Sequence, residues 1–259
     1  MFSYIGICDS PDGEQSFRYA QLFQRLCEQY GVKDCKIMIG AMMSFKSLNG
    51  IPSRGTRIFP KKEEVAGISV DHPLAFCTLH YADYDFNTSL AHLIEAGEWA
   101  GPFCHAIQLD MIWPPNVILK GFRRRFPNMQ IILQINRPAF EEVRNNPETL
   151  VKRLQLYKGL VDYILLDKSH GTGQPMKADE LLPFALAVAE HLPWLGIAGA
   201  GGLGPGSVDL IEPLVKAIPA ISWDAQGKLR PSGSADDPID GSMVDQYLLE
   251  SVQLRSKYQ

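Results

Sequence analysis

Several features that mark specialised classes of protein are missing from this chain. Its 259 residues include five cysteines, an odd number, and no two of them are spaced as C-x-x-C. Scattered cysteines of this kind indicate neither a disulfide framework nor a zinc knuckle. The N-terminal stretch MFSYIGICDS has neither the basic start nor the long apolar segment of a signal peptide. We therefore expect a cytoplasmic protein with reduced thiols.

Long apolar runs and basic tracts are missing too. No run approaches the roughly 20 apolar residues that a membrane-spanning helix needs, so we expect no membrane partner. The net charge is −4, and the short basic cluster GFRRRF occupies residues 121–126. Such a cluster is more typical of a solvated helix face than of a surface that binds several phosphates. We therefore expect no nucleic-acid partner.

Short apolar runs recur along the whole chain and alternate with amphipathic segments. About eight runs occur at intervals of about 25 to 40 residues, the period of a β-strand followed by a crossover helix. Most are almost continuously apolar, as strands are when helices bury both faces of a parallel sheet. The runs are YIGIC (4–8), CKIMIGAMM (35–43), LAFCTLHY (74–81), HAIQLDMI (105–112), QIILQI (130–135), VDYILLD (161–167), WLGIAGAGG (194–202) and AISW (220–223).

This pattern predicts an α/β protein, a single closed (β/α)8 TIM barrel over residues 1–259, with a doubly wound open sheet as the alternative. Helices are predicted at 13–31, 146–159 and 177–192, although Pro183 is expected to bend or shorten the last one. The segment 44–67, after the second strand, is rich in Gly, Pro, Ser and basic residues. We expect it to form an extended loop that covers or builds the site.

Most of the predicted strands end on an ionisable or amide side chain. Active sites of (β/α)8 barrels lie at the C-terminal ends of the strands, so these side chains should meet on one rim. A carboxylate that ends an apolar run, as Asp167 does, would lose hydration and hold its proton near neutral pH. His80 and His170 show no metal-ligand spacing with Asp110, so no metal is predicted. The rim residues include Cys8, His80, Asp110, Asn136, Asp167 and Asp224, and we predict substrate binding by His80, Asn136 and Asp224.

The stretch GIAGAGGLGPGSV at 196–208 is rich in glycine where a strand should meet a helix. Glycines let the backbone approach a bound anion, and free amides at a helix N-terminus hold phosphate. The loops after strands 7 and 8 are the usual phosphate site of this barrel. Simple tight turns would also explain the glycines. We predict phosphate binding by Gly201, Gly202, Gly204 and Gly227.

The later half of the chain resembles the phosphoribosylanthranilate isomerase family. ILLDKSHGTGQ (164–174) is similar to the family's strand-6 segment, and AGAGGLGPGSV (198–208) is similar to its phosphate loop. AIQLD (106–110) and YIGICDS (4–10) resemble its strands 4 and 1, although residues 1–100 otherwise match poorly. The resemblance implies a cofactor-free Amadori rearrangement of a phosphorylated aminosugar. It places Asp167 as general acid and Cys8 as general base.

The chain also departs from the family pattern. Asp110 stands where the family has histidine, and we include it among the candidate catalytic residues. The family's Ser-Pro-Arg after strand 2, which helps to hold anthranilate, is missing, and Lys46 or Arg54 could take its place. We therefore expect a phosphorylated small-molecule substrate whose other half differs from anthranilate. The alternatives are a lyase or aldolase that uses Lys168 as a Schiff-base amine, and a barrel that binds a phosphorylated ligand without catalysis.

Overall fold

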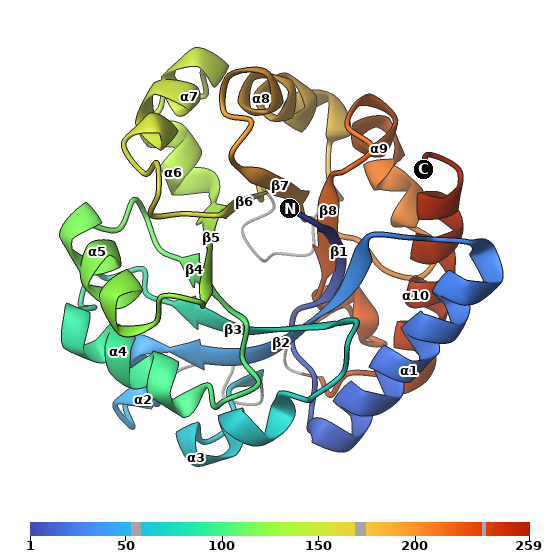
Figure 1. The fold of residues 1–259 in the computed structure, drawn as a ribbon, viewed down its shortest axis with the longest axis horizontal. Helices are drawn as coiled ribbons and strands as arrows, with labels where there is room; N and C mark the ends of the chain where they lie inside the picture. The colour runs from blue at the N-terminus through green and yellow to red at the C-terminus, as the bar shows by residue number, and fades with distance from the viewer. Residues whose placement is uncertain (53–57, 169–174, 235–236) are drawn as a thin grey trace.

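A computed structural model describes residues 1–52, 58–168, 175–234 and 237–259. Eight parallel strands form a closed barrel in the order β1-β2-β3-β4-β5-β6-β7-β8, and the helices surround it (Figure 1). The fold is thus the predicted (β/α)8 barrel. Arg54 and the His170-Gly-Thr-Gly segment lie outside the described residues, so the expectations that concern them remain predictions.

Each predicted apolar run overlaps one strand of the barrel. The strands are β1 (Ser3–Ile7), β2 (Cys35–Ser44), β3 (Ala75–Ala82), β4 (Ala106–Asp110), β5 (Gln130–Ile135), β6 (Tyr163–Leu166), β7 (Gly196–Gly199) and β8 (Ser222–Ala225). All neighbouring pairs are parallel, and β8 pairs with β1 to close the ring.

The helices follow the predicted alternation with the strands. α1 begins after Asp12, whose side chain accepts from the Gln15 amide, and it ends at Gly31, where φ is 70°. Pro183 lies inside α8 without ending it. The α-helices are α1 (Gly13–Tyr30), α2 (Phe45–Leu48), α3 (Lys62–Val65), α4 (Leu90–Trp99), α5 (Asn116–Arg125), α6 (Arg137–Glu142), α7 (Pro147–Gln155), α8 (Ala178–His191), α9 (Glu212–Ala217) and α10 (Gly241–Ser256).

The segment between β2 and β3 is irregular. Its described parts contain the short helices α2 and α3 and a 3-10 helix, η2 (Ala66–Ile68). α2 begins with a capping box in which Ser44 and Ser47 bond each other's backbone amides. Ser44, at the end of β2, thereby fixes the point at which the chain leaves the barrel rim.

The basic cluster at 121–126 is not only a solvated face. Arg123 donates to the carbonyl oxygens of Leu160 and Met129, at 3.1 and 3.0 Å, and pairs with Asp162. It therefore ties α5 to the segments that lead into β5 and β6, while Arg124 remains exposed as predicted. No helix in the described part of the chain is long and apolar enough to cross a membrane.

Side chains of alternate strand residues point into the barrel, and their character changes along each strand. The inward column of β4 is Ala106, Gln108 and Asp110, and that of β3 begins with Phe76 and reaches His80. The columns of β5 and β6 also pass from apolar to polar. Side chains alternate with a period of two, so each strand sends every second side chain into the same interior. The interior is apolar in its lower half, near the N-terminal ends of the strands, and polar in its upper half, near their C-terminal ends.

Aromatic rings close the lower end of the barrel. Phe2 and Phe76 meet edge to face, with their ring centroids 5.0 Å apart. Tyr4 lies 5.7 Å from Phe76 and 5.7 Å from Tyr163, measured between ring centroids. Tyr4, Phe76 and Tyr163 are each at most 1% exposed. The packed rings form a solid floor beneath the polar half of the interior.

Candidate active site

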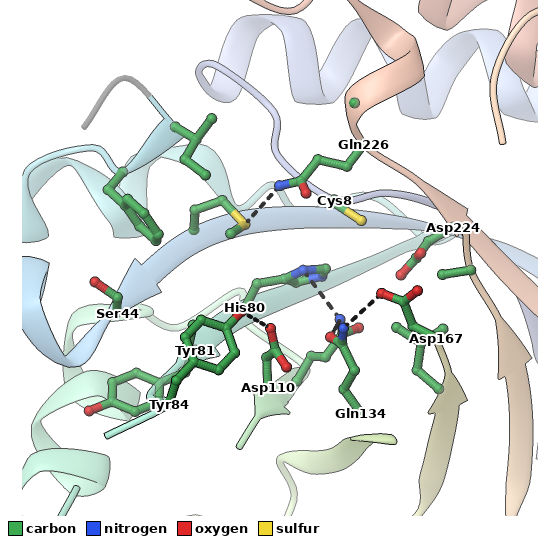
Figure 2. Close-up of a pocket in the computed structure, with 18 of the residues that line it drawn as sticks. Cys8, Ser44, His80, Tyr81, Tyr84, Asp110, Gln134, Asp167, Asp224 and Gln226 are labelled. Carbon is green, nitrogen blue, oxygen red and sulfur yellow. Dashed lines mark hydrogen bonds between the residues drawn. The ribbon is translucent and has the colours of Figure 1, made fainter. Parts of the chain in front are cut away.

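A cavity of about 740 Å³ opens at the end of the barrel where the strands finish. Figure 2 shows polar side chains of several strands converging on it. Barrels of this type build their active sites at this end. The lining includes the predicted residues Cys8, Lys46, His80, Asp110, Asp167 and Asp224, together with Ser44, Tyr84, Gln108, Gln134 and Lys228.

A row of amides connects neighbouring strands across the cavity wall. Nε2 of Gln108 donates to Oε1 of Gln134, and Nε2 of Gln134 donates to Oδ2 of Asp167, over 3.1 Å in each case. Gln108 Nε2 also lies 3.4 Å from Nδ1 of His80. Asp167 is 5% exposed. The Gln134 side chain on β5 helps to fix the direction in which the Asp167 carboxyl faces. The pattern of strand ends does not reveal the two glutamines, which lie inside the apolar runs.

Two donors hold Asp110 at the end of β4. The phenol of Tyr84 donates to its Oδ2, and Nδ2 of Asn136 donates to its Oδ1 over 2.9 Å. Such donors favour the ionised carboxylate. Asn136 is not among the described residues that line the cavity, and its Oδ1 accepts from the Ala139 amide. Asn136 therefore caps α6 and positions Asp110, and substrate binding by Asn136 stays a prediction.

Cys8, directly after β1, and Asp224, on β8, face the cavity from adjacent strands. Burial raises the pKa of the Asp224 carboxyl to about 7, and the nearby Asp167 adds to the rise. Burial also raises the pKa of the Cys8 thiol well above its ordinary value, and Asp224 and Asp9 raise it further. A thiolate base would need cations nearby. The charged groups that act on Cys8 are carboxylates, so the protein alone favours the neutral thiol.

His80 on β3 completes a compact group with Cys8 and Asp224. One ligand-type atom from each of these side chains lies within 4.8 Å of the other two. Burial lowers the pKa of His80 to about 3, so its imidazole is neutral near pH 7. A neutral imidazole carries a lone pair on one ring nitrogen. Among the described residues, these are the ones placed to share a metal ion.

The loop after β7 presents bare backbone to the cavity. Gly201 and Gly202 both line it, and Gly202 has a φ of 63°, in the left-handed region that favours glycine. Within the described part of the chain, no acceptor takes a hydrogen bond from the amides of Gly201, Gly202 or Leu203. Unpaired amides beside a cavity can hold an anion. Phosphate binding at these residues stays a prediction.

The remaining predicted phosphate and cation positions differ in their placement. Gly227 lines the cavity, whereas Gly204 is not among the described lining residues. A Cβ at Gly204 would lie 2.5 Å from Cβ of Lys228, so this glycine allows two loops to pack closely. Lys228 lines the cavity and adds a positive charge that the glycine pattern does not predict. Lys46 also lines it, with Nζ 3.5 Å from the Asp85 carboxylate.

Lys168 points away from the cavity. Its Nζ lies 5.0 Å from the ring centroid of Phe140 and 4.7 Å from that of Phe184. Both rings belong to helices outside the barrel, where an ammonium packs favourably over aromatic faces. The direction follows from strand alternation, because Asp167 faces inward and its neighbour must face outward.

A buried ion pair braces the loop after β8. Arg230 donates to Asp9, and the two residues are 2% and 7% exposed. Burial raises the pKa of Asp9 to about 6, although Arg230 opposes the rise. The Arg230 guanidinium also donates to the carbonyl oxygens of Asp237 and Gln226. The segment that carries Gly227 and Lys228 is thus fixed to the end of β1.

No protein-family model and no curated protein sequence matches the chain. Among solved structures, it is similar to phosphoribosylanthranilate isomerase from Thermus thermophilus, with a TM-score of 0.59, 13% identity and 98% of each chain covered. The enzyme from Pyrococcus furiosus gives a TM-score of 0.60 and 15% identity, over 96% of this chain and 98% of that one. Pyruvate carboxylase from Rhizobium etli gives 0.51 and 13% identity, over 99% of this chain and 25% of that one. At these identities, the similarity shows a shared (β/α)8 fold.

Proposed function

We propose that this chain is an enzyme that isomerises a phosphorylated sugar or aminosugar by general acid–base catalysis. The observation that carries the proposal is the meeting of carboxylates and unpaired amides in one cavity. Asp167 and Asp110 reach it from β6 and β4, and Gly201 and Gly202 reach it from the loop after β7. The fold shared with two phosphoribosylanthranilate isomerases supports this class of reaction.

The loops after β7 and β8 are suited to the phosphate group. The amides of Gly201 and Gly202 offer hydrogen bonds to an anion, and Lys228 supplies a full positive charge in the same wall. A phosphate bound there would anchor the substrate and leave its sugar ring free to reach the carboxylates. Binding energy from this non-reacting group would then orient the reacting carbons.

In the proposed reaction Asp167 is the acid and Asp110 is the base, and both side chains line the cavity. Asp167 is buried, and in its protonated form it would donate a proton to the ring oxygen and open the sugar. Asp110, which accepts hydrogen bonds from Tyr84 and Asn136, would take the proton from carbon 2. Ring opening breaks the bond between carbon 1 and the ring oxygen, as a lone pair of the carbon-1 amine or hydroxyl forms an iminium or carbonyl group. After proton removal, the electron pair of the C–H bond forms the double bond between carbons 1 and 2, and the pair of the former double bond at carbon 1 moves to its nitrogen, or to its oxygen together with a proton. The resulting enolamine or enediol then loses the proton of its carbon-2 hydroxyl and gains one at carbon 1 to give the ketose. Cys8 takes no part in this scheme.

The Schiff-base alternative has less support from the geometry. A lysine that forms an imine with a substrate must reach the cavity, and Lys168 packs over Phe140 and Phe184 on its outer side. A barrel that only binds a phosphorylated ligand would keep the glycines and need no proton donor. Turnover and hydrogen exchange at carbon 2 distinguish that alternative from the isomerase.

The proposal can be tested with a panel of phosphorylated aldoses and their N-glycosyl amines in D2O. NMR would follow aldose-to-ketose conversion and the exchange of the carbon-2 hydrogen for deuterium. We expect Asp167→Asn to lower turnover by about 100-fold or more while the protein stays folded. Lys168→Met, at the next position but outside the cavity, is the matched control and should keep wild-type turnover.

Two results would overturn the isomerase. Binding of a sugar phosphate by the wild-type protein, with neither conversion nor exchange, would show a binding protein. Loss of turnover in Lys168→Met, together with full activity in Asp167→Asn, would show imine chemistry instead.

A further inference from the structure

Three side chains of different chemistry meet in the cavity wall, and the acid–base reaction above does not use them. Cys8, His80 and Asp224 are 7%, 6% and 2% exposed. They come from the end of β1, from β3 and from β8, and Figure 2 shows them turned toward the same space. Three segments that are distant in the sequence therefore place a sulfur, a ring nitrogen and a carboxylate together.

Two of these side chains carry a buried polar atom without a partner. Nε2 of His80 and Oδ2 of Asp224 have no hydrogen-bond partner within the described part of the chain. Native proteins pair nearly all of their buried polar atoms, and an exception indicates a functional role or a missing ligand. Both unpartnered atoms belong to the same three-residue group, so a single ligand could satisfy them.

The electrostatic surroundings favour a positively charged ligand. Asp224 lies near Asp167, and no lysine or arginine is among the described groups that act on it. Arg230, on the following loop, is already paired with Asp9. Buried charges in proteins are normally paired or bound to a metal. A cation held beside Asp224 would supply the missing positive charge.

We propose that Cys8 Sγ, His80 Nε2 and the Asp224 carboxylate bind a zinc ion. Thiolate, neutral imidazole and carboxylate are the usual ligands of zinc, and three protein ligands leave a fourth position for water or substrate. Tetrahedral zinc with bonds of about 2.0–2.3 Å places its ligand atoms about 3.5 Å apart. One ligand-type atom of each side chain now lies within 4.8 Å of the other two, so these atoms need to close by about 1.3 Å at most. Binding would displace the proton of the Cys8 thiol.

Gln108 is placed to orient the histidine ligand. A histidine that binds metal through Nε2 keeps its hydrogen on Nδ1 and donates it to a neighbouring oxygen. Nδ1 of His80 faces the Gln108 side-chain amide at 3.4 Å, and Oε1 of Gln108 has no partner among the described residues. A half-turn of this amide would bring Oε1 to Nδ1, and the Gln134 amide would have to turn with it, because Gln108 Nε2 now donates to Gln134 Oε1. Gln108 is therefore a positioning residue of the site.

The zinc site can be established without knowledge of the substrate. Zinc binding depends on the three ligands, and the proposed sugar-phosphate reaction does not require it. Bound zinc would polarise a carbonyl or hydroxyl oxygen of the molecule in the cavity. Metal binding and isomerase activity can therefore fail or succeed separately.

The first experiment uses the full chain, freed of metal by a chelator and then titrated with zinc chloride by calorimetry. We expect one equivalent of zinc per chain. Cobalt(II) in place of zinc should give a thiolate-to-cobalt charge-transfer band in the near ultraviolet. A crystal soaked in zinc should show an anomalous peak between Cys8, His80 and Asp224. This measurement does not require a variant to fold.

Variants then test each ligand. We expect Cys8→Ser, His80→Gln and Asp224→Asn each to weaken zinc binding by about 100-fold or more, and Gln108→Leu by about 10- to 100-fold. The matched controls Cys104→Ser and His92→Gln should bind as the wild type does. Circular dichroism of the metal-free variants reports their folding. The proposal is overturned if the wild type binds no stoichiometric zinc, if the anomalous peak lies elsewhere, or if folded ligand variants bind normally.

Discussion

Replacing Arg230 by methionine should expose how much the buried ion pair contributes to stability. The change leaves the Asp9 carboxylate, 7% exposed, without its partner. It also removes donors to the carbonyl oxygens of Asp237 and Gln226, now at 2.8 and 3.0 Å. Breaking one side of a buried pair costs about 3–5 kcal/mol. At about 2–4 °C per kcal/mol for a chain of this size, Tm should fall by roughly 6–20 °C.

Urea unfolding, followed by circular dichroism at pH 8, would measure the loss. Asp9, with its pKa of about 6, is ionised in the wild type at that pH. Arg230→Met combined with Asp9→Leu should recover most of the stability, because no buried charge then remains. The exposed Arg124→Met is the control and should change the free energy of unfolding by less than about 0.5 kcal/mol. A cost below about 1 kcal/mol for Arg230→Met would refute the reasoning, since that is the value of a surface pair.

Three further predictions concern other parts of the molecule. Gly40→Ala would place a Cβ 1.9 Å from the Cys8 carbonyl oxygen, so it should cost about 3 kcal/mol in urea unfolding, whereas Gly67→Ala, with open space around it, should cost little. Burial and Lys36 lower the pKa of His105, and an NMR titration should give a midpoint below the ordinary value of about 6.5. A midpoint at or above that value would contradict the burial argument. A tryptophan auxotroph that lacks phosphoribosylanthranilate isomerase should not grow when it carries this gene, and growth at the normal rate would show that anthranilate is accepted.

The barrel could be predicted from the sequence because its signal is repeated along the chain. Strands buried on both faces are short apolar runs, and each predicted run overlaps one observed strand. Local rules were less reliable where tertiary contacts compete with them. Pro183 was expected to bend or shorten a helix, and α8 is not shortened, because it continues through Pro183 to His191. Arg123 was expected to be solvated, but it holds the carbonyl oxygens of Met129 and Leu160.

The candidate site could be predicted only where the strand ends carry it. Asp110, Asp167 and Asp224 lie at or next to the C-terminal ends of strands, and all of them line the cavity. Gln108 and Gln134 lie inside the apolar runs, so attention to the ends alone misses them. The two-residue period of a strand would have found them. Gln108, for example, lies two residues before Asp110, so both side chains must face the same side of the sheet.

Other features depend on contacts that no local pattern contains. Tyr84 reaches Asp110 from the loop after β3, and Arg230 reaches Asp9 across most of the chain. Asn136 also caps α6, and Gly204 also lets two loops pack closely, and neither contact can be seen from the pattern of strand ends.

The aromatic floor of the barrel has a consequence for molecular traffic through the cavity. Tyr4, Phe76 and Tyr163 are packed beneath the polar residues, so these rings close the lower end to solvent. A molecule that enters at the upper mouth must therefore leave by the same opening. Product has to depart before the next substrate arrives, so the two compete for one passage. Any turnover in this cavity should show product inhibition that is competitive with the substrate.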